Sequence, residues 1–203
     1  LQFATGGYVI DGDTLTLDGG AQATIRVGDG SAVGETFTAT IAADIAGTAQ
    51  LLKTDLGTLV LSGDNTYTGG TRLDDGGLVL ASDNALGTGA LTTRDDTSVT
   101  LGDGVTIANA ITLGGDTTFD TEVLALGTPG AATISGTISG TGALILTDSS
   151  DLTLTGVNTY SGGTTLRGLT TITNGSALGT GTITAAGGVL TIGADGIVLA
   201  NDI

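Results

Sequence analysis

A long internal repeat constrains the fold of this 203-residue chain more than any other feature of its sequence. Residues 57–71 read GTLVLSGDNTYTGGT and residues 150–164 read SDLTLTGVNTYSGGT, with nine identities in fifteen positions at an offset of 93. The pentapeptide ALGTG at 85–89 recurs 92 residues later, at 177–181. Fixed long periods are typical of repeat architectures. We therefore predict a single segment over residues 1–203, with internal repeats at about 41–109 and 134–201.

Within each repeat, short alternating segments predict strands that are separated by turns. Residues 58–61 (TLVL) and 152–154 (LTL) alternate with a period of two, and Thr, Ile and Val favour strands. The 37 glycines interrupt every stretch that is long enough to form a helix. A hydrophobic content of 39% is too high for a disordered tail. The chain is therefore predicted to be all-β.

Two architectures fit short strands at this spacing, namely an antiparallel sandwich or barrel and a parallel β-solenoid. A sandwich needs unlike strands and usually aromatic core residues, whereas this chain repeats like strands and holds three Phe and three Tyr. The solenoid is favoured, with about ten coils of about 20 residues each. At a strand spacing of about 4.8 Å the rod would be about 45–50 Å long, and the long period would cover four or five coils.

The most regular recurring residues are predicted to be structural turns of the repeat. They are Asn65, Tyr67, Gly69 and Gly70 in the first copy, and Asn158, Tyr160, Gly162 and Gly163 in the second. Asn accepts left-handed backbone geometry and bonds its own turn, Gly-Gly allows a tight corner, and the tyrosine is expected to pack over that corner. The alternative is that the two tyrosines are sugar-stacking platforms. It is disfavoured because they would stand about 20 Å apart.

The composition removes most classes of enzyme and of ligand site. Without His or Cys the chain has no Ser-His-Asp triad, cysteine nucleophile, structural zinc site or disulfide. Five basic residues and a net charge of -16 make nucleic acid and anionic membranes poor partners. We expect no catalytic residue, no cofactor and no enzymatic activity. A polysaccharide-cleaving enzyme with paired carboxylates is the less favoured alternative.

Acidic clusters raise the question of calcium. The candidates are Asp74-Asp75, Asp95-Asp96, and Asp116 with Asp120 and Glu122. Neither the tandem nine-residue pattern of a calcium β-roll nor an EF-hand loop is present. We therefore predict no metal site, and the acids are interpreted as a solvated surface.

At this point the sequence resembles a known family. Residues 57–71 followed by DNALGTGAL at 83–91, and residues 151–164 followed by GSALGTGTI at 175–183, are similar to the passenger-associated transport repeat, also called the autotransporter-associated β-strand repeat. The resemblance implies a right-handed parallel β-helix on the bacterial cell surface. It also implies attachment to a C-terminal outer-membrane β-barrel in the parent protein. Lys53 occupies the family's usual basic position, where the second copy has Leu146.

The function that follows is that of a surface-exposed stalk in a type V secreted autotransporter. Such a segment would support export and display, and the expected partners are host-surface or matrix molecules or a second copy of the chain. The alternative is a glycan- or matrix-binding module that acts through an exposed face. The chain opens at Leu1 without a targeting signal, so we expect a piece of a longer protein.

Overall fold

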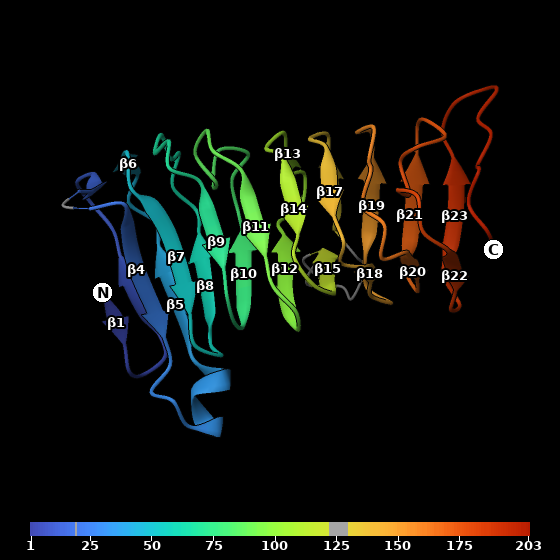
Figure 1. Cartoon of the computed structure of the whole chain (residues 1–203). Helices are drawn as coiled ribbons and strands as arrows, with labels where there is room; N and C mark the ends of the chain where they lie inside the picture. The colour runs from blue at the N-terminus through green and yellow to red at the C-terminus, as the bar shows by residue number, and fades with distance from the viewer. Residues whose placement is uncertain (19, 122–129) are drawn as a thin grey trace.

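The computed structural model describes residues 1–18, 20–121 and 130–203, and these fold as a rod of stacked coils. Every pair of neighbouring strands is parallel in this part of the chain, and the strands stand side by side along the rod from the N-terminal to the C-terminal end (Figure 1). The largest sheet has nine strands, one from each coil. The predicted parallel β-solenoid is therefore confirmed, and the described residues form nine coils, close to the predicted ten.

Each coil has three sides, which we call A, B and C in chain order. Side A holds β1 (Gln2–Phe3), β4 (Gln22–Val27), β7 (Gln50–Thr54), β9 (Thr71–Leu73), β11 (Leu91–Thr93), β14 (Ile111–Leu113) and β17 (Ile138–Gly140). Side B holds β2 (Tyr8–Ile10), β5 (Thr38–Ile41), β8 (Thr58–Leu61), β10 (Gly77–Leu80), β12 (Thr97–Leu101), β15 (Thr117–Thr121), β18 (Leu144–Leu146), β20 (Thr164–Leu166) and β22 (Ile183–Ala185). Side C holds β3 (Leu15–Leu17), β6 (Ile45–Gly47), β13 (Thr106–Ile107), β16 (Ala131–Ile134), β19 (Asp151–Leu154), β21 (Leu169–Ile172) and β23 (Val189–Ile192).

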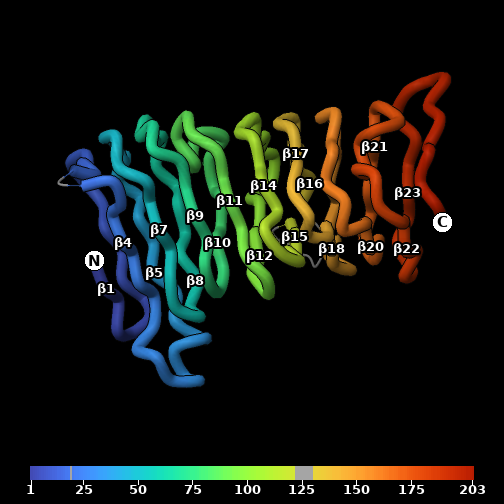
Figure 2. The backbone as a smooth tube through the Cα atoms, viewed as in Figure 1, coloured from blue at the N-terminus to red at the C-terminus, as the bar shows by residue number. Residues whose placement is uncertain are grey.

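Two further features complete the course of the chain, which Figure 2 traces as a tube. The 3-10 helix η1 (Ala32–Thr36) projects from the corner between β4 and β5. On side C, residues 62–70 and 81–90 continue the stack between β6 and β13 through inter-coil hydrogen bonds, although they form no strand. No helix within the described ranges is long and apolar enough to cross a membrane.

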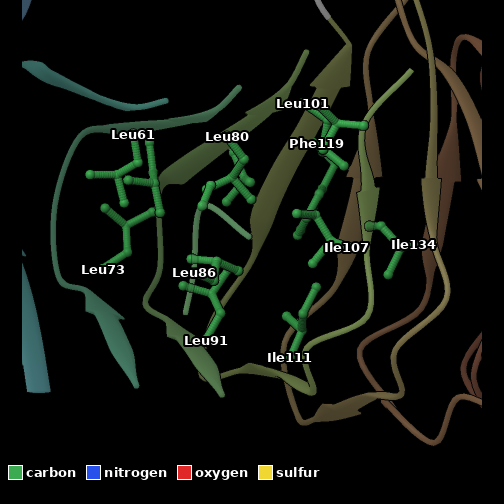
Figure 3. Close-up of a cluster of buried hydrophobic side chains, with 14 of the residues drawn as sticks. Leu61, Leu73, Leu80, Leu86, Leu91, Leu101, Ile107, Ile111, Phe119 and Ile134 are labelled. Atoms are coloured by element: carbon green, nitrogen blue, oxygen red, sulfur yellow. The ribbon is translucent and has the colours of Figure 1, made fainter. Parts of the chain in front are cut away.

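The core fills the centre of the rod, because alternate residues of each strand point inward. On side B, one inward position is occupied in successive coils by Leu59, Leu78, Val99 and Phe119, all of them buried. Figure 3 shows such side chains from several coils meeting in the interior. Burial of one aliphatic side chain stabilises the folded state by about 1.5–3 kcal/mol. A narrow interior filled almost entirely by aliphatic residues explains why so few aromatics are present.

The two copies of the repeat do not lie on the same sides of the rod. At the offset of 93, β7 corresponds to β18 and β8 corresponds to β19. β7 lies on side A and β18 on side B, while β8 lies on side B and β19 on side C. The period therefore covers four coils and one additional side, within the predicted four or five coils. All three sides need only inward apolar residues, so one sequence motif can occupy any of them.

Candidate functional site

Asn65 and Asn158 connect three successive coils. The side-chain oxygen of Asn65 accepts a hydrogen bond from the backbone N–H of Ile45 at 2.7 Å, and its amide nitrogen donates to the carbonyl of Ala85 at 2.6 Å. Asn158 makes the same two bonds, with Ile138 and Ala177, at the same distances. Both asparagines are buried. One side chain thus ties its own coil to the coil before and to the coil after.

This geometry corrects the predicted role of the two asparagines. Both were expected to adopt left-handed backbone geometry and to bond their own turns. Within the described ranges, the non-glycine residues with positive φ are Asp55 and Asp96. The Asn partners instead lie about one coil away along the chain, at separations of 19 or 20 residues. The bridging bonds pair buried backbone groups of the coils on either side, which would otherwise lack partners.

Tyr67 and Tyr160 are core residues. Both are fully buried, and their hydroxyls share hydrogen bonds with the hydroxyls of Thr71 and Thr164 at 2.5 and 2.6 Å. Burial raises the pKa of Tyr67 to about 12, against the opposing effect of the Thr71 hydroxyl, and it also raises the pKa of Tyr160. Neither ring is accessible to a sugar, so the alternative of a stacking platform is wrong.

The Gly-Gly pairs lie where neighbouring coils come closest. A Cβ on Gly69 would stand 2.3 Å from the carbonyl carbon of Ala49, and one on Gly162 would stand 2.3 Å from that of Gly142. No side chain is accommodated at such distances. The second glycine of each pair has a positive φ, which is +77° at Gly70 and +94° at Gly163, and at Gly70 it lets the chain turn into β9. The recurring residues therefore hold adjacent coils at close range.

Lys53 is a buried cation inside the rod. On side A it stands in register between Ile25 and Leu73, and its side chain is not exposed. Its ammonium donates to the carbonyl of Asp55 at 2.5 Å and to that of Asp75 at 2.9 Å. Burial lowers the pKa of Lys53 to about 8, and the carboxylates of Asp55 and Asp75 oppose that shift.

Many of the acids close the corners of the coils. The carboxylates of Asp44, Asp83, Asp95, Asp103 and Asp116 accept hydrogen bonds from the backbone N–H groups of Asp64, Thr106, Asp116, Ala131 and Ala143, respectively, at 2.7–3.0 Å. Each acceptor and its donor belong to successive coils. The five acids are exposed, as the predicted solvated surface requires, but they also pair backbone groups at the corners. This role was missed because each partner lies one coil away along the chain, and for four of the five acids no residue of the same type recurs at the sequence period.

The acids that were considered for calcium and interpreted as a solvated surface have other partners. Asp74 lies between two guanidinium groups, at 2.7 Å from Arg72 and 2.8 Å from Arg94. Asp120 accepts a hydrogen bond from the hydroxyl of Ser149, and Glu122 lies outside the described residues. In the ranges that the structure covers, no group of three or more His, Cys, Asp or Glu side chains could hold a metal ion.

A half-open hollow lies beside this ion-pair cluster. It has a volume of about 350 Å³ and is lined by Asp74, Asp75, Arg94, Asp95 and Gly114. The hollow brings together Asp74 and Asp75 with Asp95 of the second acidic pair, at the corner between sides A and B. It does not contain the eight predicted turn residues, most of which are buried.

Comparison with known proteins identifies the repeat. The model of the passenger-associated-transport-repeat matches residues 51–80 and 137–168, which include both Asn-Thr-Tyr segments and the buried Lys53. The adhesin BmaC autotransporter of Brucella suis biovar 1 (strain 1330) is 40% identical over 200 residues, which cover 97% of this chain. These two segments therefore belong to the passenger-associated-transport-repeat family. No solved structure matches it.

These matches confirm the resemblance to the autotransporter passenger repeat, and they support a location at the bacterial surface. The segment spans 5% of the length of the BmaC autotransporter. A non-enzymatic role agrees with the adhesin relative and with the solenoid fold.

Proposed function

We propose that the chain is one continuous stalk segment, residues 1–203, of an outer-membrane-anchored adhesin passenger, and that it has no enzymatic activity of its own. The observation that carries this proposal is the bridging of three coils by Asn65 and again by Asn158. The most regular residues of the repeat, spanning about 41–109 and 134–201, thus serve to stack coils. A stack of this kind provides length and rigidity.

The same stack supports a role in export. Each coil of a solenoid is stabilised mainly by its neighbours, so folding can propagate from coil to coil. Coils that fold outside the cell would hinder backward movement of the chain through the pore. The C-terminal outer-membrane β-barrel of the parent would be the partner in this process. The lack of Cys suits a chain that crosses an oxidising compartment unfolded.

Deletion of one whole coil tests this function in the parent protein. Leu91 of β11 and Ile111 of β14 are register partners, so removal of residues 91–110 joins equivalent points of successive coils. Removal of residues 91–100 ends the deletion within β12 and leaves the following coil out of phase. Surface display is measured by antibody labelling of intact cells.

The proposal predicts that the whole-coil deletion keeps surface display within about twofold of the unmodified parent. The partial deletion should lower display several-fold, because its coils cannot stack. Equal display of both variants would contradict the proposal, because export would then be independent of coil stacking.

A binding role through an exposed face is the second candidate, and one surface favours it. Thr106, Thr133, Thr153, Thr171 and Thr191 occupy the same outward position in five successive strands of side C. This column of hydroxyls could contact a glycan or a matrix protein without basic or aromatic side chains. Binding of the segment to a glycan and matrix-protein array, lost in a T133A/T153A/T171A variant, would support it. Equal binding by that variant would exclude this face.

A further inference from the structure

Lys53 has surroundings that no other basic residue of the chain shares. The five basic residues are all within the described ranges, and Arg26, Arg72, Arg94 and Arg167 are each partly or fully exposed, whereas Lys53 is completely buried. Both of its hydrogen bonds go to backbone carbonyls at the corner between sides A and B, one in its own coil and one in the next. Both hydrogen bonds of the ammonium can therefore form only when these two successive corners are correctly aligned.

The second copy closes the corresponding corner without a cation. Leu146, which is equivalent to Lys53, is fully buried between Phe119 and Leu166. There the hydroxyl of Thr121 donates to the carbonyl of Ser149 and accepts from the backbone N–H of Asp151. A corner of this fold can therefore be completed by hydroxyl groups and an apolar side chain. Closure of the corner alone does not explain a buried charge.

The core residues alone specify the register between neighbouring coils only weakly, because the coils are so alike. A slip of two residues between neighbouring strands preserves the inward and outward alternation and keeps aliphatic residues inside. With Lys53 in place, a two-residue slip of the next coil would move the carbonyl of Asp75 by about 7 Å. The ammonium would then be buried with an unpaired donor, which is strongly unfavourable.

We propose that Lys53 sets the register between the third and fourth coils, because its ammonium finds both carbonyl partners only in the native alignment. The carboxylates of Asp55 and Asp75 are the negative charges that act on the buried ammonium. Asp55 pairs with Arg26 at 2.8 Å, and Asp75 is the acid of the next corner. A buried polar group that fixes register in a repetitive apolar core is the best-attested use of such groups.

Disulfide trapping measures register directly, since the chain has no cysteine of its own. Val60 and Val79 are in register on β8 and β10, so a V60C/V79C pair reports the native alignment. In that alignment Thr58 opposes Gly77, which places Thr58 and Val79 about 8 Å apart. A T58C/V79C pair is too distant to form a disulfide unless the strands slip by two residues.

Each cysteine pair is placed in the native background and in K53L, which copies the leucine of the second repeat. L146M serves as a matched control, because it changes a buried side chain without changing charge. We expect the T58C/V79C pair to oxidise at least tenfold faster in K53L than in the native background, with no change in L146M. Folding of each variant is checked by far-UV circular dichroism.

Equal oxidation rates in the K53L and native backgrounds would overturn the proposal. If K53L does not fold, Lys53→Met is tested in the same way, since it keeps the length of the side chain. Failure of both variants to fold would also overturn the proposal. It would show that the ammonium is needed for folding as such, and not for choosing among registers.

Discussion

The buried ammonium of Lys53 makes a specific prediction about stability and pH. Its pKa is about 8 in the folded chain, against 10.5 for an ordinary lysine. Between these two values the unfolded chain binds more protons than the folded chain, so the free energy of unfolding rises with pH. Below about pH 8 the full cost of burying the charge is present, and it disappears as pH rises toward 10.5.

The size of this effect follows from the two pKa values. At about 1.4 kcal/mol per pKa unit, the difference between the two pKa values corresponds to a total of about 3 kcal/mol. Of this, about 2 kcal/mol is recovered between pH 7 and pH 9.5. The comparison stops at pH 9.5 because the tyrosines of the unfolded chain ionise near pH 10. Above that pH, the raised pKa values of Tyr67 and Tyr160 in the folded chain lower the free energy of unfolding as pH rises.

Urea unfolding of the segment, followed by far-UV circular dichroism at pH 7 and pH 9.5, measures this gain. Native-state hydrogen exchange at the backbone amides of β7 and β9 reports the same gain locally, after correction for the intrinsic exchange rate. The K53L variant should lose the gain, because no group remains at that position to titrate. An unchanged or falling stability from pH 7 to pH 9.5 would refute the reasoning, as would an equal gain in K53L.

Three further predictions concern the contacts between coils, all read from thermal or urea unfolding. Asn65→Ala should lower the free energy of unfolding by about 2–4 kcal/mol, because two buried backbone groups lose their partners. Asn84→Ala, at an exposed asparagine, should change it by less than about 1 kcal/mol. Similar losses in the two variants would contradict the bridging role. Gly69→Ala should prevent native stacking of its coil, since its Cβ would meet backbone at 2.3 Å, and Gly20→Ala, with its nearest neighbour at 3.9 Å, should be close to neutral. Asp116→Asn should be tolerated and Asp116→Ala should cost about 1 kcal/mol, because the carboxylate acts as an acceptor for a backbone N–H; equal losses in both variants would mean that the charge matters instead.

The sequence predicted the architecture because periodicity and composition act on every coil. Alternation with aliphatic residues inward and Thr outward is sufficient to specify a strand and its buried face, as for Leu152, Thr153 and Leu154 of β19. The repeat also located Asn65, Tyr67 and the Gly-Gly pair. Their positions were found, while the role of the asparagines was not, because their partners lie one coil away and the sequence does not show which coil is the neighbour.

The side on which a motif lies could not be predicted for a related reason. The coils differ in length at their corners. A residue and its equivalent 93 positions later therefore lie on different sides of the rod, as β7 and β18 do. The acids that close corners are likewise fixed by where the chain turns, so Asp95 and Asp116 are partners although no sequence period relates them. Lys53 was visible only as a basic position, since burial depends on which side chains stack above and below it.

A distance between two spin labels on side B tests the central claim, a regular stack of parallel coils, most directly. Thr58 on β8 and Thr184 on β22 occupy the same outward column, six strands apart. At about 4.8 Å per strand, the stack predicts a narrow distribution of backbone separations near 29 Å. A broad distribution, or a separation that differs from this value by more than the length of the labels, would contradict a continuous solenoid.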